Sequence, residues 1–168
     1  MIASGRADVE LRAVEVADEA FLRRLFASTR VELSLVGWSA EQVDAFLTLQ
    51  FNARERHYHE WFPTCEHFLV LSGGQPAGRL CVVHAELEVR IVDIALLPEH
   101  RGGGIGSSLI TALQEEAATA GLPLVLHVEA GNPAANLYHR LGFVIDAADG
   151  VYTAMCWRPE TSAAGSGR

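Results

Sequence analysis

The residues with the clearest chemical potential form one short run, Arg101-Gly102-Gly103-Gly104-Ile105-Gly106-Ser107, between an expected strand and an expected helix. Glycines let a backbone approach a ligand closely, and the first amides of a helix lack internal partners at the positive end of its dipole. Such a turn is suited to a phosphate or pyrophosphate, and Arg101 adds a fixed positive charge. A flexible turn without a ligand is the simpler alternative, which the order of strand, turn and helix disfavours.

Two nucleotide-binding motifs can be compared with this turn. A Walker loop requires lysine, and the chain has none. A Rossmann turn requires glycine or alanine at the sixth position, where the run starting at Gly102 has Ser107, although Glu129 could imitate the acid that binds the ribose. The turn also follows an expected antiparallel meander, so a dinucleotide-binding protein remains only an alternative.

Composition limits the possible partners. The net charge is −8, and all 13 basic residues are arginine. This acidic balance argues against nucleic acid or an anionic membrane as a partner, and the lack of lysine excludes Schiff-base catalysis. The three cysteines are far apart without a C-x-x-C spacing, so we expect reduced, buried thiols and no metal. With no apolar run of membrane-spanning length and no signal peptide, we expect a cytoplasmic protein.

The elements that must position the turn follow from hydrophobic periodicity. A chain of 168 residues, with loose termini at 1–8 and 159–168, suits one domain. Asp18 and Ser39 are expected to cap the first two helices, and a hairpin at 67–84 extends into a meander. The expected strands are 9–14, 67–71, 79–84, 88–97, 124–129, 143–145 and 151–157, and the expected helices are 18–28, 39–62, 104–120 and 133–141.

A second motif follows the turn further along the chain: Asn132 and then Leu137-Tyr138-His139-Arg140-Leu141-Gly142-Phe143, after the strand Leu124-Val125-Leu126-His127-Val128. Together the two motifs resemble the GNAT superfamily of acyl-CoA-dependent N-acyltransferases, of the bacterial type, over residues 67–157. The resemblance implies an α+β fold. Its twisted, mainly antiparallel mixed sheet has about six to seven strands flanked by helices, with a central β-α-β crossover at the cofactor site.

The resemblance implies roles for particular residues. Acetyl-CoA would be the acyl donor, with its pyrophosphate on the amides of 102–107 and its pantetheine arm along the backbone of Ile94, Ala95 and Leu96. Asn132 matches a position that often contacts the cofactor. Tyr138 matches the family's proton donor to the leaving thiolate, whereas the simpler interpretation is a core aromatic residue.

Attack of an amine on a thioester requires the neutral amine, so a base or a chain of waters must accept a proton. His127 is the first candidate, because it lies opposite the face shared by Leu124, Leu126 and Val128, where some family members have a glutamate base. A structural histidine is the alternative. Asp93 is the second candidate and Glu129 the third.

In the family, the region around the second helix, before most of the sheet, covers the acceptor site. Its aromatic residues can simply pack in the core, or they can define an acceptor pocket with Glu55 or Glu60 that suits a cationic amine. The residues concerned are Trp38, Tyr58, Trp61 and Phe62. The expected function is direct transfer of an acetyl group, in a ternary complex, to a primary amine of a small molecule or peptide. A catalytically inactive CoA-binding sensor or scaffold is the alternative, and the sequence leaves a homodimer open.

Overall fold

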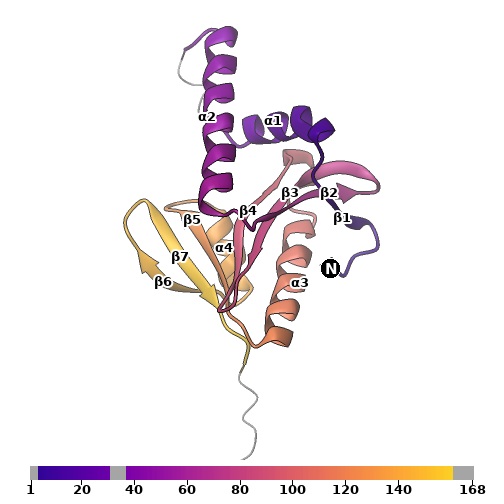
Figure 1. Ribbon diagram of the computed structural model, residues 1–168, viewed down its shortest axis with the longest axis vertical. Coiled ribbons are helices and arrows are strands. Elements are labelled where there is room, and N and C mark those ends of the chain that lie inside the picture. Colours follow the sequence, from indigo (N-terminus) through magenta and orange to yellow (C-terminus); the bar gives the residue numbers. More distant parts are fainter. Residues whose placement is uncertain (1–3, 31–36, 161–168) are drawn as a thin grey trace, which may run out of the picture.

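A computed structural model describes residues 4–30 and 37–160, which form one seven-stranded sheet with helices packed against it (Figure 1). The strand order is β1-β2-β3-β4-β5-β7-β6. The strands are β1 (Val9–Ala13), β2 (Glu66–Ser72), β3 (Gln75–His84), β4 (Val89–Leu96), β5 (Leu124–Glu129), β6 (Val144–Ala148) and β7 (Tyr152–Trp157). The helices are α1 (Glu19–Ser28), α2 (Ala40–Trp61), α3 (Ile105–Ala120) and α4 (Ala134–Arg140), with short 3₁₀ turns at Val16–Asp18 and Pro98–His100.

The pairing of the strands confirms the expected α+β fold. Strands β2, β3 and β4 form the antiparallel meander, and β4 then pairs with β5 in parallel through the α3 crossover. The parallel ladder is short: it joins Val89, Arg90 and Ile91 to 124–126 and extends no further. Beyond Ile91 the two central strands no longer pair with each other, although β4 continues its pairing with β3 as far as Leu96.

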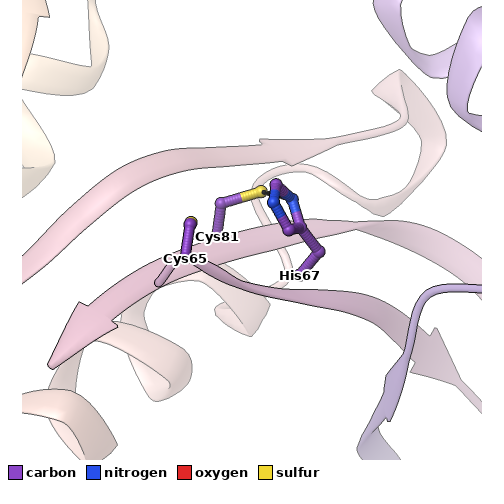
Figure 2. A group of neighbouring side chains, drawn as sticks. All are labelled: Cys65, His67 and Cys81. Atoms are coloured by element: carbon purple, nitrogen blue, oxygen red, sulfur yellow. Dashed lines mark hydrogen bonds between the residues drawn. The ribbon is translucent and has the colours of Figure 1, made fainter. Parts of the chain in front are cut away.

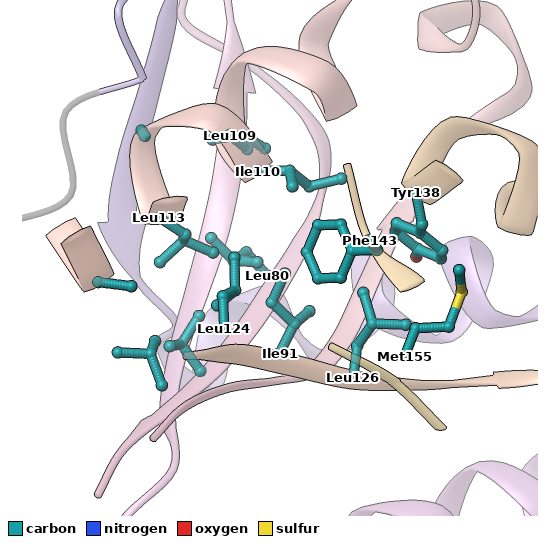
Figure 3. Packing of buried hydrophobic residues seen from close by; sticks show 14 of the residues in the cluster. Leu80, Ile91, Leu109, Ile110, Leu113, Leu124, Leu126, Tyr138, Phe143 and Met155 are labelled. Atoms are coloured by element: carbon teal, nitrogen blue, oxygen red, sulfur yellow. The ribbon is translucent and has the colours of Figure 1, made fainter. Parts of the chain in front are cut away.

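The larger hydrophobic core lies between the sheet and α3 (Figure 3). Leu109, Ile110 and Leu113 recur at helical spacing on α3 and are fully buried, while Leu80 and Val82 alternate along β3 to meet them. The α4 region contributes to the same core, because the rings of Tyr138 and Phe143 pack together with their centroids 5.8 Å apart.

A smaller core lies on the opposite face of the sheet, under α1 and α2. It joins Leu22 and Phe26 of α1 to Phe51 of α2 and Leu69 of β2. Phe51 is the one buried residue of α2, whose first turns extend beyond the sheet (Figure 1). The helix begins as expected, because Ser39 and Gln42 form a reciprocal capping box.

Several expectations about local structure are wrong. The Asp18 carboxylate bonds the Glu15 amide and the Arg12 guanidinium, rather than capping the first turn of α1. Trp61 does not pack in the core, since it is 71% exposed. The strand expected at 143–145 is present, but its bounds differ, since it runs over Val144–Ala148.

The expected loose termini can be compared with the structure only in part, since 1–3 and 161–168 lie outside the described residues. Within the terminus expected at 1–8, Ser4 is buried and its hydroxyl donates to the Val9 carbonyl at 2.6 Å. This end of the chain is therefore held against the first strand from Ser4 onward. None of the helices in the described residues is long and apolar enough to cross a membrane.

Packing in the core under α3 predicts which side chains the fold can least afford to lose. Leu113 is fully buried, so Leu113→Ala leaves both a transfer loss and a cavity. It should lower the free energy of unfolding in urea by about 2–5 kcal/mol. The matched control is Leu49→Ala on α2, where the side chain is 67% exposed. That variant should keep a free energy of unfolding close to the parent value. Equal losses in the two variants would contradict this assignment of the core.

Candidate active site

The glycine-rich turn begins α3 at the end of β4, where the sheet opens. Gly104 is the N-cap of α3 with a φ of 84°, a left-handed conformation that side chains rarely adopt. Ser108 donates the helix bond to the Gly104 carbonyl at 3.0 Å, so the amides of Ile105, Gly106 and Ser107 lie before that bond. Within the described residues, no side chain bonds this end of the helix as a cap. The turn therefore presents backbone donors at the positive end of the α3 dipole.

Two arginines hold this turn. Arg101 donates from Nε to the Leu96 carbonyl at 2.8 Å, which links the turn to the end of β4. Arg6 donates from Nη1 to the Gly103 carbonyl and also pairs with Asp8 at 2.7 Å. Sequence reasoning missed the role of Arg6, because 97 positions separate it from Gly103. The only hint in the sequence is that Arg6 precedes the first strand. Both guanidinium groups bring positive charge to a chain that is acidic overall.

A cavity of about 890 Å³ joins this turn to the separation between β4 and β5. Most of the residues that the sequence assigned to the cofactor line it: Ile94, Ala95, Leu96, Arg101, Gly102, Gly104, Gly106, Ser107 and Asn132. Gly103 and Ile105 belong to the same turn but are not in the cavity wall, and Ile105 is buried in the α3 core. The parallel ladder between β4 and β5 ends at Ile91, and Ile94, Ala95 and Leu96 of β4 line the cavity beyond that point.

Tyr138 lies in the wall of this cavity and is 7% exposed. Burial, together with the negative charge of Asp93, raises the pKa of Tyr138 to about 12. The phenol therefore keeps its proton across the neutral range, which suits a donor. Asn132 lies in the same wall, where its Oδ1 accepts a hydrogen bond from the Ala134 amide at 2.9 Å and so fixes the loop before α4.

The three candidate bases differ in their surroundings. His127 does point away from the core face of β5, but it is exposed, is not in the cavity wall, and accepts a bond at Nδ1 from Arg90 at 3.1 Å. Arginine can only donate, so this contact engages the Nδ1 lone pair of a neutral His127 ring. Glu129 lies in the cavity wall and is exposed.

Asp93 occupies the opposite face of β4 from Ile94. Its side chain is 17% exposed, and its buried Oδ2 has no hydrogen-bond partner among the described residues. Two cations lie just beyond hydrogen-bond distance, Arg54 at 3.7 Å and Arg79 at 3.9 Å. A carboxylate held in this way keeps a free lone pair close to the open part of the sheet.

A buried arginine organises the face of the sheet under α2. Arg79 of β3 is 1% exposed and forms two bonds to Glu55 of α2, at 2.5 and 3.1 Å. Its guanidinium also lies 5.4 Å from the ring of Tyr58. A second cavity of about 440 Å³ lies here, lined by Val14, Leu22, Glu55, His59, His67 and Arg79. Sequence reasoning placed Arg79 in a strand but gave it no function, because only the fold brings Glu55 to it.

This arrangement changes the expected acceptor pocket. Of the four aromatic residues proposed, Tyr58 joins the Arg79 network, whereas Trp38 packs on Phe46 and Trp61 is exposed. Burial alone would raise the pKa of Glu55, but its hydrogen bonds and its attraction to Arg79, and then to Arg54, outweigh burial and lower it. The negative charge of the Glu55 carboxylate is therefore already balanced by the Arg79 guanidinium.

The chain belongs to the Acetyltransferase (GNAT) family, whose model matches residues 35–143. It has the fold of acetyl-CoA-dependent N-acetyltransferases. The PaiA N-acetyltransferase of Thermoplasma acidophilum, solved with coenzyme A, superposes with a TM-score of 0.66 at 16% identity over 89% of this chain and 98% of that one. The spermidine N-acetyltransferase SpeG of Vibrio cholerae superposes with a TM-score of 0.59 at 22% identity, over 91% of this chain and 95% of that one.

Curated relatives include mycothiol acetyltransferases of Streptomyces species. That of Streptomyces griseus is 33% identical over 102 residues, which are 58% of this chain and 33% of the relative. That of Streptomyces bingchenggensis is 33% identical over 127 residues, which are 68% of this chain and 41% of the relative. The matches thus span between a third and about two fifths of these longer proteins. The family match displaces the dinucleotide-binding alternative.

The Glu55–Arg79 pair predicts a pH-dependent contribution to stability. Glu55→Gln should lower the free energy of unfolding at pH 7 by about 1–3 kcal/mol, because it leaves a buried guanidinium without its carboxylate. The folded pKa of Glu55 is depressed. Its contribution is therefore present above the ordinary glutamate pKa of about 4.3 and is lost as the pH falls. Urea unfolding of parent and variant between pH 7 and pH 3 measures it.

Glu60→Gln on the exposed side of the same helix is the control. It should follow the parent at every pH. A Glu55→Gln deficit that stayed constant down to pH 3 would show that the ion pair does not account for the loss.

Proposed function

We propose that this protein transfers the acetyl group of acetyl-CoA directly to a primary amine, of a small molecule or a peptide, within a ternary complex. The observation that carries the proposal is the cavity bounded by the turn of α3, the free side of β4 and Tyr138. A pyrophosphate fits the donors of the turn, and an extended pantetheine arm fits the backbone of 94–96 as an added strand would. The thioester would then lie where β4 and β5 part.

Two groups on opposite faces of the sheet would handle the protons. Asp93 would accept the proton of the attacking amine, directly or through a water, because its Oδ2 has a free lone pair. Tyr138 would donate to the departing thiolate of CoA from the cavity wall. His127, the first candidate from sequence, is replaced in this role by Asp93 because its Nδ1 is occupied by Arg90.

The acceptor would approach from the side of α2, toward Asp93. The second cavity, with Glu55, His67 and Arg79 in its wall, lies on that side of the sheet. Arg54 and Arg79 balance Glu55 and Asp93 in charge, so an acceptor with a single amine and polar neighbours suits this surface better than a strongly cationic one. Free amino acids, short peptides, aminoglycosides and spermidine form the panel that tests this expectation.

The affinity for acetyl-CoA tests the proposed role of the turn at the start of α3. Gly104→Glu should abolish binding of acetyl-CoA measured by calorimetry, because a carboxylate would stand at the anion site and the left-handed φ of 84° disfavours any side chain. Ala120→Glu adds the same charge at the other, exposed end of α3 and should bind as the parent does. Circular dichroism checks that both variants fold. Parent-like affinity in folded Gly104→Glu would remove the turn from the site.

Tyr138 should matter for the chemical step. Tyr138→Phe is expected to lower kcat by about 10- to 1000-fold, with the smaller loss if water substitutes as the acid, and to leave the affinity for acetyl-CoA unchanged. The release of free CoA, followed with a thiol reagent and a competent acceptor, measures the rate. Unchanged turnover would exclude Tyr138 from the mechanism.

The choice between the bases is tested by comparing three variants with one acceptor. Asp93→Asn should lower kcat by about 100-fold or more and leave the affinity for acetyl-CoA close to the parent value. His127→Ala should retain the parent kcat. Glu129→Gln is the second control. Loss of kcat in either control, with Asp93→Asn unaffected, would reassign the base to that residue.

A further inference from the structure

Two cysteines and a histidine meet beside the β2–β3 hairpin (Figure 2), and none of the three lines the cavity beside the turn of α3. Cys65 immediately precedes β2, His67 lies in β2, and Cys81 lies directly opposite His67 in β3. The two sulfur atoms and one ring nitrogen of His67, which are the atoms that could bind a metal, lie within 4.8 Å of one another. Sequence reasoning treated these cysteines as distant from each other and expected both to be buried. The hairpin brings them together, and Cys65 is only partly buried.

The cluster already holds a positive charge. Arg79 donates from Nε to the Cys81 sulfur at 2.8 Å and from Nη2 to His67 Nδ1 at 2.9 Å. Its side chain is almost completely buried, so a divalent cation on the same donors would have to displace the guanidinium or lie against it. The expectation of no metal therefore stays a prediction, and this arrangement favours thiol chemistry.

The two thiols differ in a way that suits a redox pair. The Cys81 thiol hydrogen bonds to Cys65 and, with the charge of Arg79, lowers the pKa of Cys65 despite partial burial. Burial raises the pKa of Cys81 well above its ordinary value. Cys65 is thus the partly exposed thiol with the lowered pKa, and Cys81 is the buried thiol with the raised pKa beside it.

We propose that Cys65 and Cys81 are a modification site, at which a hydroperoxide oxidises the pair to a reversible disulfide. The Cys65 thiolate attacks the peroxide oxygen, the O–O bond breaks and an alcohol or water leaves, which gives a sulfenic acid on Cys65. The Cys81 sulfur then attacks Cys65, the S–S bond forms and water leaves with the Cys81 proton. The two thiols supply the two electrons that reduce the peroxide, and a dithiol reverses the step.

The position of Cys65 allows this bond to form. The two sulfurs start within 4.8 Å of each other, and they must approach to bonding distance. Cys65 is outside the β2 ladder and is held by a turn in which its amide bonds the Phe62 carbonyl at 2.9 Å. That turn can move without breaking strand pairing. Oxidation would alter the Cys81 sulfur that accepts a bond from Arg79, and so would act on the network that reaches Glu55.

The test is a count of free thiols after oxidation. Reduced full-length protein, desalted without oxygen, is treated with one equivalent of hydrogen peroxide and then alkylated with N-ethylmaleimide. The parent has three cysteines, and after oxidation only one of them should be labelled. Before labelling, the oxidised protein should be lighter than the reduced protein by two hydrogens, and its digest should contain a Cys65–Cys81 crosslinked peptide. Dithiothreitol should restore all three labels.

Cys156→Ser is the matched control, because Cys156 lies in β7 away from the pair. It should form the same crosslink, whereas Cys65→Ser and Cys81→Ala should form no intramolecular disulfide. Accumulation of sulfinic acid on Cys65 with Cys81 still free would overturn the proposal. So would stoichiometric zinc in the purified protein, measured by elemental analysis, with both thiols protected from alkylation until a chelator removes it.

Discussion

The separation of β4 from β5 after three residue pairs is the constraint on which the rest of the site depends. Backbone groups inside a sheet normally satisfy one another, and an early end to pairing leaves donors and acceptors that need another partner. Here the separation opens beside the turn that begins α3, so strand edge and helix terminus border one cavity. A cofactor with an extended amide-containing arm and a pyrophosphate would satisfy both.

The same opening connects the two faces of the sheet. Tyr138 reaches it from the α3 face, and Asp93 lies on the face covered by α2. Burial and then the charge of Asp93 raise the pKa of Tyr138. Arg79, buried beneath α2, bonds Glu55, while one oxygen of Asp93 stays unbonded within the described structure. The proposed proton acceptor and the proposed proton donor would thereby lie on either side of the space that a thioester would occupy.

Much of this could be predicted from the sequence, because the signals are local. The change from helical to alternating periodicity at Pro63, the capping box at Ser39 and the glycine turn at 102–106 each depend on adjacent residues. What sequence reasoning missed depends on residues that are distant in the chain: Arg6 on Gly103, Arg79 on Glu55, and Cys65 beside Cys81. For the same reason, strand alternation gave the face on which His127 lies but not the arginine that bonds its ring nitrogen.

Amide chemical shifts of the isotope-labelled protein during titration with acetyl-CoA test the proposed cofactor site most directly. We expect the largest changes at two separate segments, the amides of 102–107 and those of 94–96, with the same binding isotherm for both. Smaller changes should reach the residues around Tyr138. Changes confined to other elements, such as the exposed β6 edge, with the turn and β4 unmoved, would contradict this assignment of the site.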